Sequence, residues 1–291
     1  MRRARLSLQG LSVGDAFGER FFVNPSTVES LIEQRAIPRP PWRCTDDTIM
    51  AASIVDVLEA CGTIDQDQLA RAFARRYAAD VDRGYGGIAH QVLRAIAFGH
   101  DWREVASGAF DGTGSMGNGG AMRAAPIGAF AQGEPALAAR EARLSAQVTH
   151  AHPEGQAGAV AVAVAASVVD AAATPADVFS AVLAATPRGD TYAGLVAASE
   201  LALDRDVAEA VRLLGNGTQV LSQDTVPFAL WCVAKSFDSF TNAMWTTVSG
   251  LGDRDTTCAI VGGVIAVRRA AEPIPTDWLA AREPLDRLPG A

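Results

Sequence analysis

The stretch "WRCTDDTIMAAS", residues 42–53, places Thr45, Asp46 and Asp47 in a row immediately before an apolar helical pattern. One short polar side chain is enough to cap a helix N-terminus, and acidic groups suit its positive end, so capping alone explains this cluster taken singly. A second cluster near the other end of the chain has the same form. In "GLGDRDTTCAIVGG", residues 250–263, a glycine-containing loop with two aspartates and a threonine again leads into an apolar helix. Two such clusters in one chain need an explanation beyond capping.

Four carboxylates held in one place repel each other unless something compensates their charge. At a separation of about 5 Å the repulsion is roughly 3 kcal/mol per pair for an effective dielectric constant of about 20. Hard divalent cations with oxygen ligands compensate such charge, and threonine hydroxyls add neutral oxygens. The absence of a His/Cys ligand set favours Mg²⁺, Mn²⁺ or Ca²⁺ over zinc. The sequence therefore predicts a metal site if the fold brings the two clusters together.

Long segments rich in Ala, Leu and Val, with a period near 3.6 residues, dominate the rest of the chain. Examples are "DQLARAFARRYAADV" and "GEPALAAREARLSAQV", and Pro/Gly clusters such as "IPRPPWR" and "DGTGSMGNGG" separate such segments. Alternating β-branched strands joined by Asn-Gly hairpins are missing from the sequence. The pattern predicts an all-α protein of about ten or more helices. No linker or shift in composition divides the chain, so we expect a single domain over residues 1–291.

Composition limits the class of partner. The formal net charge is −8 and no run of basic residues offsets it, which argues against non-specific binding to nucleic acid or to an anionic membrane. The longest apolar run, residues 157–169, is too short and too rich in alanine to span a bilayer and predicts a buried helix. Lys235, the one lysine of the sequence, lies away from any glycine-rich loop, which excludes a P-loop. With dispersed cysteines and no secretory signal, the chain is expected in the cytoplasm.

Two loops are further candidates for binding. In "GSMGNGGAMR", residues 114–123, glycines let backbone N–H groups approach an anion closely, although a flexible loop before a helix has the same composition. In "THAHPEG", residues 149–155, the proline and glutamate suit the first turn of a helix, and a helix N-terminus binds anions without lysine. His150 in this loop is either a ligand-contacting or a structural residue.

Four motifs in this order, "TDDT", "GSMGNGGAMRAAPIG", "THAHPEGQAGA" and "GDRDTT", resemble those of the ADP-ribosylglycohydrolase family, which includes dinitrogenase-reductase-activating glycohydrolase and ADP-ribosylarginine hydrolase. The agreement runs from about Gly10 to Arg269. It implies a compact orthogonal helical bundle with its core over about residues 10–270 and a two-metal site in a cleft. By this resemblance two Mg²⁺ or Mn²⁺ ions are bound by Thr45, Asp46, Asp47, Asp253, Asp255 and Thr256.

The resemblance also implies contacts to ADP-ribose. The residues concerned are Tyr85, Gly86, Ser115, Met116, Gly117, Asn118, Gly119 and His150. The glycine-rich loop would hold the diphosphate and the distal ribose, and Tyr85 packs either on the adenine or in the core.

The chain departs from the family pattern at two positions. Family members place a glutamate about four residues beyond the second glycine of the segment that reads "GDAFGERFF" here; this chain has Phe22 at that position, and its glutamate, Glu19, directly follows Gly18. Arg254 stands between the two aspartates of "GDRDTT", where a small or neutral residue is more common. Because alternate residues of an extended loop point in opposite directions, we expect Arg254 to face away from the metals and brace the loop. The alternative is that it reaches the mouth of the cleft.

The activity implied by the resemblance is a metal-dependent hydrolysis. ADP-ribose would be released from an ADP-ribosylated protein or small molecule, arginine-linked substrates being favoured, by cleavage of the glycosidic bond at the anomeric carbon of the ribose. Glu19, Asp46 and Asp47 are the candidates for the base that activates water. The alternatives are a non-catalytic ADP-ribose-binding module and a two-metal nucleotide phosphohydrolase.

Overall fold

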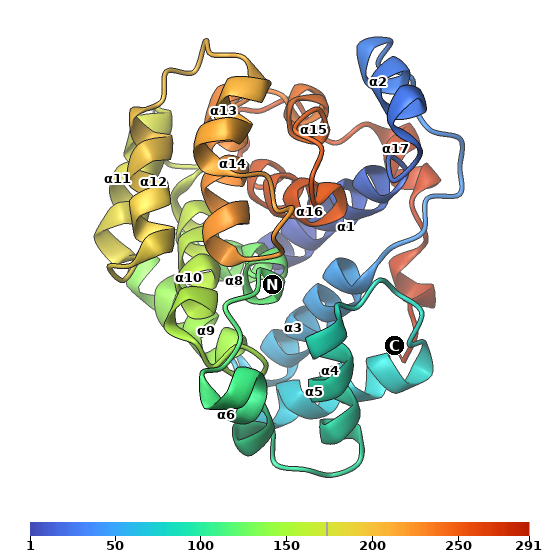
Figure 1. Cartoon of the computed structure of the whole chain (residues 1–291), viewed down its shortest axis with the longest axis vertical. Helices are drawn as coiled ribbons and strands as arrows, with labels where there is room; N and C mark the ends of the chain where they lie inside the picture. Colours follow the sequence, from blue (N-terminus) through green and yellow to red (C-terminus); the bar gives the residue numbers. More distant parts are fainter. Residues whose placement is uncertain (173, 291) are drawn as a thin grey trace.

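The computed structural model describes residues 1–172 and 174–290, and within these residues the chain is built from helices without a β-strand (Figure 1). The all-α prediction is thereby confirmed. The elements in chain order are α1 (Arg2–Glu19), α2 (Pro25–Glu33), α3 (Asp46–Cys61), α4 (Gln66–Ala79), α5 (Gly87–Ala97), α6 (Trp102–Gly112), α7 (Gly119–Met122), α8 (Ala125–Phe130), α9 (Pro135–Gln147), α10 (Pro153–Val168), α11 (Pro175–Ala185), α12 (Asp190–Glu200), α13 (Val207–Leu214), α14 (Ser222–Lys235), α15 (Phe240–Val248), α16 (Arg254–Ile265), α17 (Thr276–Ala281) and the 3₁₀-helix η1 (Leu285–Arg287).

Helix α10 is buried along most of its length. The alanine- and valine-rich run at residues 157–169 is apolar on every face, which is typical of a helix that has neighbours on all sides. Residues 159–166 are all buried, and α10 packs against α8, α9, α11 and α14. The prediction of a buried helix over this run is therefore confirmed. Among the residues that the structure describes, no helix is both long and apolar enough to cross a membrane.

Helices α1 and α16 lie against each other at backbone distance. Three glycines of α1, spaced four residues apart, face the backbone of α16, and the pairs are Gly10 with Gly262, Gly14 with Cys258 and Gly18 with Arg254. A Cβ atom added at Gly14 would lie 2.1 Å from the carbonyl oxygen of Cys258, so no other residue fits there without a shift. Since rising numbers in α1 meet falling numbers in α16, the helices are antiparallel. The end of α1 is thereby placed beside the beginning of α16.

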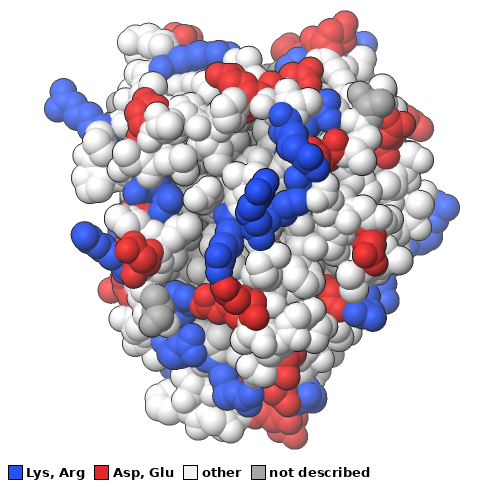
Figure 2. All heavy atoms as spheres, turned by 180° about the vertical axis from the view of Figure 1, so that it is seen from behind, with Lys and Arg blue, Asp and Glu red and all other residues white. Residues whose placement is uncertain are grey.

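Acidic and basic side chains are interleaved on the face shown in Figure 2, where a band of Lys and Arg side chains crosses the middle. A surface cavity of about 610 Å³ is lined by Arg2, Arg3, Arg5 and Arg269, among others. Arg3 and Arg269 both form ion pairs with Asp170, at 3.3 and 2.9 Å, and Arg5 pairs with Glu59. Much of the positive charge around this cavity is therefore compensated by neighbouring carboxylates.

Candidate active site

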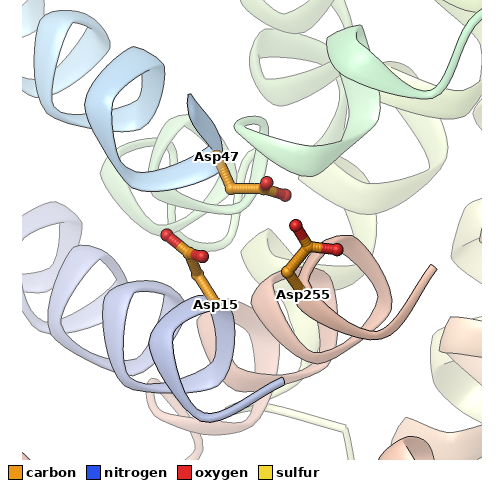
Figure 3. A group of neighbouring side chains, drawn as sticks. All are labelled: Asp15, Asp47 and Asp255. Atoms are coloured by element: carbon orange, nitrogen blue, oxygen red, sulfur yellow. The ribbon is translucent and has the colours of Figure 1, made fainter. Parts of the chain in front are cut away.

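The two acidic clusters of the sequence meet in space. Asp47 in the first turn of α3 and Asp255 in the first turn of α16 point toward each other, and Asp15 of α1 completes the group (Figure 3). Each of the three side chains offers an oxygen that lies within 4.8 Å of the others. The antiparallel pairing of α1 and α16 brings Asp15 and Asp255 together, and the start of α3 adds the third carboxyl group.

Burial and mutual repulsion disfavour the ionised forms of these carboxyl groups. Burial, reinforced by the charges of Asp15 and Asp253, raises the pKa of Asp46 to about 8. The pKa values of Asp47 and Asp255 are also raised well above the usual range, first by burial and then by neighbouring carboxylates. The Oδ1 atom of Asp47 is buried and has no hydrogen-bond partner among the described residues. An unsatisfied carboxylate oxygen within an all-oxygen set fits a hard divalent cation, which would supply the missing partner.

Asp15, which the sequence analysis did not select, fixes the position of the segment that begins α3. Its carboxylate accepts hydrogen bonds from the backbone N–H groups of Thr45 and Thr48, at 3.0 and 3.2 Å, and from the hydroxyl groups of both threonines. The Thr45 hydroxyl also lies 2.9 Å from Oδ2 of Asp47. Burial raises the pKa of Asp15 to about 6, although these hydrogen bonds act in the opposite direction. The sequence feature that could have identified Asp15 is its place inside the apolar stretch "LSVGDAF", because an aspartate is rarely buried unless it is paired or functional.

A cavity of about 590 Å³ opens beside the carboxyl groups. Of the residues singled out in the sequence, those that line it are Asp46, Gly86, Ser115, Met116, Gly117, Asn118, Gly119, His150, Asp253, Asp255 and Thr256. Thr45 and Asp47 are buried next to this lining. Glu19 is exposed at the end of α1 and does not belong to the lining, so its catalytic role stays a prediction.

The glycine-rich loop is tied to the acidic cluster. The side-chain amide of Asn118 donates to Oδ2 of Asp253 at 2.7 Å and to the Thr225 hydroxyl at 3.0 Å. The imidazole of His150 lies against the same loop, since a Cβ atom added at Gly119 would be 2.8 Å from its Cε1 atom and one at Gly117 would be 3.2 Å from its Nε2 atom. The loop therefore needs these glycines to pass the histidine closely, and both groups border the cavity.

The aromatic residues Tyr85 and Phe110 differ in their relation to the cavity. Tyr85 is buried against Tyr77 and His90, with ring centroids 5.1 and 5.9 Å away, and is not part of the cavity lining. Its packing corresponds to the core alternative. Phe110 lines the cavity, and the residue is 57% exposed. Its φ is 52°, and Val220, which also lines the cavity, has a φ of 57°. Such backbone conformations are costly for non-glycine residues and are concentrated at binding sites. No sequence signal beyond the adjacent glycine-rich loop marked Phe110.

Arg254 contacts the segment that follows α1. Its Nη1 donates to the carbonyl oxygen of Phe21 at 2.9 Å, and its guanidinium lies 4.7 Å from the centroid of the Phe22 ring. It does not line the cavity. Arg254 is the first residue of α16 rather than part of an extended loop, and among the described residues it forms no ion pair, so its bracing role stays a prediction.

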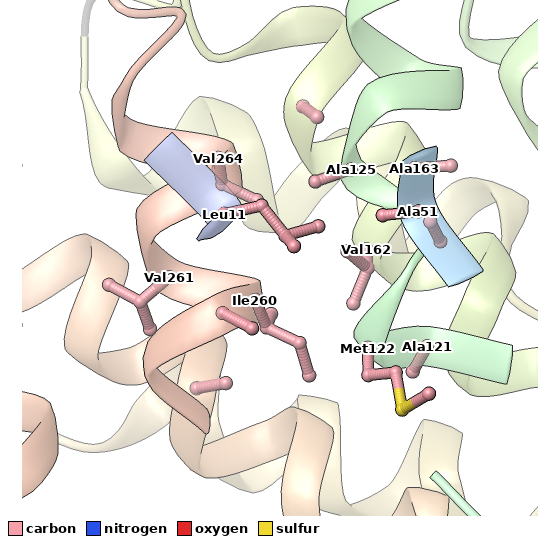
Figure 4. Packing of buried hydrophobic residues seen from close by; sticks show 14 of the residues in the cluster. Leu11, Ala51, Ala121, Met122, Ala125, Val162, Ala163, Ile260, Val261 and Val264 are labelled. Atoms are coloured by element: carbon pink, nitrogen blue, oxygen red, sulfur yellow. The ribbon is translucent and has the colours of Figure 1, made fainter. Parts of the chain in front are cut away.

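The helices that carry the carboxyl groups share one apolar core (Figure 4). Leu11 of α1, Ala51 of α3 and Ile260 of α16 are fully buried, and Val162 of α10 lies with them. Since protein interiors are close-packed, the positions of the carboxyl groups are fixed by this packing.

The helices converge on a buried set of carboxyl groups beside a glycine-rich loop and a histidine. This arrangement defines a class of helical protein with a small-molecule cavity bordered by carboxyl groups. Residues 1–290 match the family model described as ADP-ribosylglycohydrolase. The chain is 31% identical over 267 residues to ADP-ribosylhydrolase ARH3 of Mus musculus, covering 80% of this chain and 71% of the mouse protein. It is 30% identical over 268 residues to ADP-ribosylhydrolase ARH3 of Homo sapiens, covering 80% of this chain and 73% of the human protein. The chain belongs to the ADP-ribosylglycohydrolase family.

The fold is shared with a solved structure described as an ADP-ribosylglycohydrolase-related protein complex. The TM-score is 0.70 at 23% sequence identity, with 99% of this chain and 94% of the other chain covered. The compact helical bundle expected from the resemblance is thereby confirmed.

Proposed function

We propose that this protein is a metal-dependent hydrolase that releases ADP-ribose from an ADP-ribosylated target by cleaving the glycosidic bond at the anomeric carbon of the ribose. The observation that supports this most directly is the meeting of carboxyl groups from α1, α3 and α16 at one cavity, next to a glycine-rich loop. Family membership supplies the substrate class. The cavity volume of about 590 Å³ falls in the range of small-molecule sites.

The proposed metal ligands are oxygen atoms throughout. Two Mg²⁺ or Mn²⁺ ions would be held by Thr45, Asp46, Asp47, Asp253, Asp255 and Thr256. When bound, such ions lower the pKa of coordinated water and stabilise developing negative charge. The role of Asp15 is to hold Thr45 and Thr48, and through them the first turn of α3, in the position that the ligands need.

Asp46 is our first candidate for the base that accepts a proton from the attacking water. Of the three candidates, Asp46, Asp47 and Glu19, it is the one that lines the cavity. In the metal-free protein, burial and neighbouring charges raise its pKa to about 8, and a bound ion would lower this pKa because a ligand carboxylate binds in its ionised form. Glu19, at the exposed end of α1, is the alternative that the sequence motif suggests.

The same cavity offers groups for the rest of ADP-ribose. The backbone N–H groups of Gly117 and Asn118 already donate to the Ser115 hydroxyl oxygen and the Val220 carbonyl oxygen. The other N–H groups of loop 115–119 and the ring of His150 would bind the diphosphate. The exposed side chains of Phe110 and Met116 provide an apolar rim on which a nucleobase could stack.

Arginine-linked ADP-ribose is our first choice of substrate. This choice rests on the family resemblance, because Asp46, Asp253 and Asp255 line the cavity as proposed metal ligands and two bound ions would compensate their charge. Arg254, which would repel a guanidinium leaving group if it reached the cavity, is engaged with Phe21 and Phe22 instead.

A product analysis tests the proposal. The protein is incubated with Mg²⁺ and arginine-, serine- or nucleobase-linked ADP-ribose, and we expect free ADP-ribose with intact phosphates, released fastest from the arginine-linked substrate. No turnover on any of the three would support a binding module, and released phosphate would support a phosphohydrolase.

The assignment of the base is tested by two conservative variants. Asp46→Asn is expected to lower kcat by about 100-fold or more, whereas Glu19→Gln should retain kcat within about twofold. Since Asp46 is also a proposed ligand, Mn²⁺ affinity is measured in parallel. A large loss of kcat in Glu19→Gln with unchanged metal affinity would make Glu19 the base.

A further inference from the structure

Arg123 is a buried cation without a carboxylate partner. Its side chain is fully buried, and among the described residues it forms no ion pair. Its Nη2 donates to the carbonyl oxygen of Ser145 at 3.0 Å and to the hydroxyl oxygen of Thr149 at 2.9 Å, and its guanidinium lies 4.6 Å from the centroid of the Phe73 ring. Burial lowers the pKa of Arg123 to about 9, so the group is still positive at neutral pH. The carboxyl group of Asp46 acts on this charge without forming an ion pair, and Arg123 and Thr149 both border the cavity. The cost of burying a cation there points to a role at this site.

Thr149 connects this guanidinium to His150. The Thr149 hydroxyl oxygen lies 2.7 Å from Nδ1 of His150. A guanidinium only donates, so the hydroxyl oxygen accepts from Arg123 and its own hydrogen is free to be donated onward. If that hydrogen goes to Nδ1, the ring proton of His150 resides on Nε2. In the opposite arrangement Nδ1 donates to the hydroxyl oxygen, and the Thr149 hydrogen has no acceptor among the described residues, which disfavours this arrangement because a buried donor without an acceptor is costly.

The Nε2 side of the ring faces the cavity loop. A Cβ atom added at Gly117 or Gly119 would lie 3.2 or 3.1 Å from Nε2, and His150 lines the cavity with both glycines. Among the described residues Nε2 has no hydrogen-bond partner. Burial and the charge of Arg123 lower the pKa of His150 to about 3, so the ring is neutral at pH 7. A neutral ring carries its single proton on either Nδ1 or Nε2. If Nδ1 accepts a hydrogen bond, Nε2 carries the proton and presents a donor to the cavity; if Nδ1 donates, Nε2 presents a lone pair.

We propose that Arg123 and Thr149 are positioning residues that hold His150 in its Nε2–H form, so that the ring donates a hydrogen bond to an anionic oxygen bound at loop 115–119. The proposal rests on the proposed function in one respect, namely that this oxygen belongs to the diphosphate of ADP-ribose. The opposite form would present a lone pair to the diphosphate and repel it.

Thr149→Val is the discriminating variant because it removes the hydroxyl group and keeps the shape of the side chain. Thr149→Ser restores the hydroxyl group. Thr247→Val serves as a control for the loss of a buried threonine hydroxyl group, since Thr247 is buried outside the cavity lining and donates to the carbonyl oxygen of Ala243 in α15. Urea unfolding establishes that each variant is folded.

The first measurement is the protonation of the His150 ring in ligand-free protein, by ¹⁵N NMR of histidine-labelled samples. We expect a protonated Nε2 and an unprotonated Nδ1 in the wild type, in Thr149→Ser and in Thr247→Val. In Thr149→Val we expect a mixture of the two forms. A wild-type ring protonated on Nδ1 would overturn the proposal whatever ligand the protein binds.

The second measurement is the affinity for ADP-ribose by calorimetry. Thr149→Val should weaken binding by about tenfold, whereas Thr149→Ser and Thr247→Val should bind within about twofold of the wild type. The shift in Tm caused by Mg²⁺ should be unchanged in all three. Wild-type affinity in Thr149→Val would overturn the proposal. If the wild type binds no ADP-ribose, the proposed function fails, and the NMR result alone decides the arrangement at His150.

Discussion

At the scale of single residues, Asp15 has a task that a neutral isostere cannot perform. Its two carboxylate oxygens accept hydrogen bonds only, from Thr45 and Thr48. In Asp15→Asn one oxygen is replaced by an NH₂ group that faces other donors. We expect a loss of about 2 kcal/mol in the free energy of unfolding, measured by urea denaturation, together with a reduced Tm shift on addition of Mg²⁺. An Asn variant with wild-type stability would show that these contacts are dispensable.

Asp47 and Asp255 are expected to be essential for metal binding and turnover. A ligand that binds only the folded state raises its stability by mass action, so a functional site must show a Tm increase with Mg²⁺. Asp47→Ala and Asp255→Ala should each abolish that increase and the release of ADP-ribose. Asp170→Asn is the control, because Asp170 is a largely buried carboxylate that pairs with Arg3 and Arg269 away from the cavity. A wild-type Mg²⁺ shift in either alanine variant would contradict the two-cluster site.

At the scale of elements, the close pairing of α1 and α16 sets the distance between Asp15 and Asp255. Gly14→Ala would place a methyl group at the carbonyl oxygen of Cys258 and push the helices apart. We expect a destabilisation of about 3 kcal/mol by urea denaturation and a weaker Mg²⁺ shift. Gly108→Ala in α6 is the matched control, because an added Cβ atom there meets nothing within 4 Å, and its stability should be unchanged or slightly higher. Equal effects of the two substitutions would show that the close pairing is unimportant.

The helices could be predicted from the sequence where a local pattern of apolar or capping residues specifies them. The 3.6-residue period and the apolar run at 157–169 predicted the helices and the burial of α10. The capping pattern predicted the beginnings of α3 and α16. The meeting of these two helix starts was not contained in either pattern, since it depends on the packing of segments some 200 residues apart. The family resemblance supplied it.

The same distinction applies to the site residues. Asp46, Asp253 and His150 were selected from motifs and lie at the cavity. Asp15 was missed because its partners, Thr45 and Thr48, are distant in sequence. Tyr85 was expected either on the adenine or in the core, and its ring packs against Tyr77 and His90; the sequence leaves this choice open because tertiary packing decides it.

At the scale of the whole molecule, the buried carboxyl groups make the stability of the metal-free protein depend on pH. The folded-state pKa of Asp46 is raised to about 8, and those of Asp47 and Asp255 are raised well above the usual range, whereas an aspartate in the unfolded chain has a pKa of about 3.9. These carboxyl groups hold their protons more tightly in the folded protein than in the unfolded chain, so their contribution to the free energy of unfolding is fully present below about pH 4. It is lost as the pH rises through the folded-state pKa, which for Asp46 is about 8.

Divalent ions should remove this loss, because metal ligands bind in the ionised form and the bound charge offsets their repulsion. We therefore expect the difference in Tm between protein with Mg²⁺ and protein with EDTA to increase from about pH 5 to about pH 8. The difference is the informative quantity, since charged groups far from the cavity affect both samples equally and cancel. Asp255→Asn should abolish the increase, whereas Asp170→Asn, which alters a carboxylate outside the cavity, should retain it. A Tm difference that is independent of pH in the wild type would mean that the ion does not bind to these carboxyl groups.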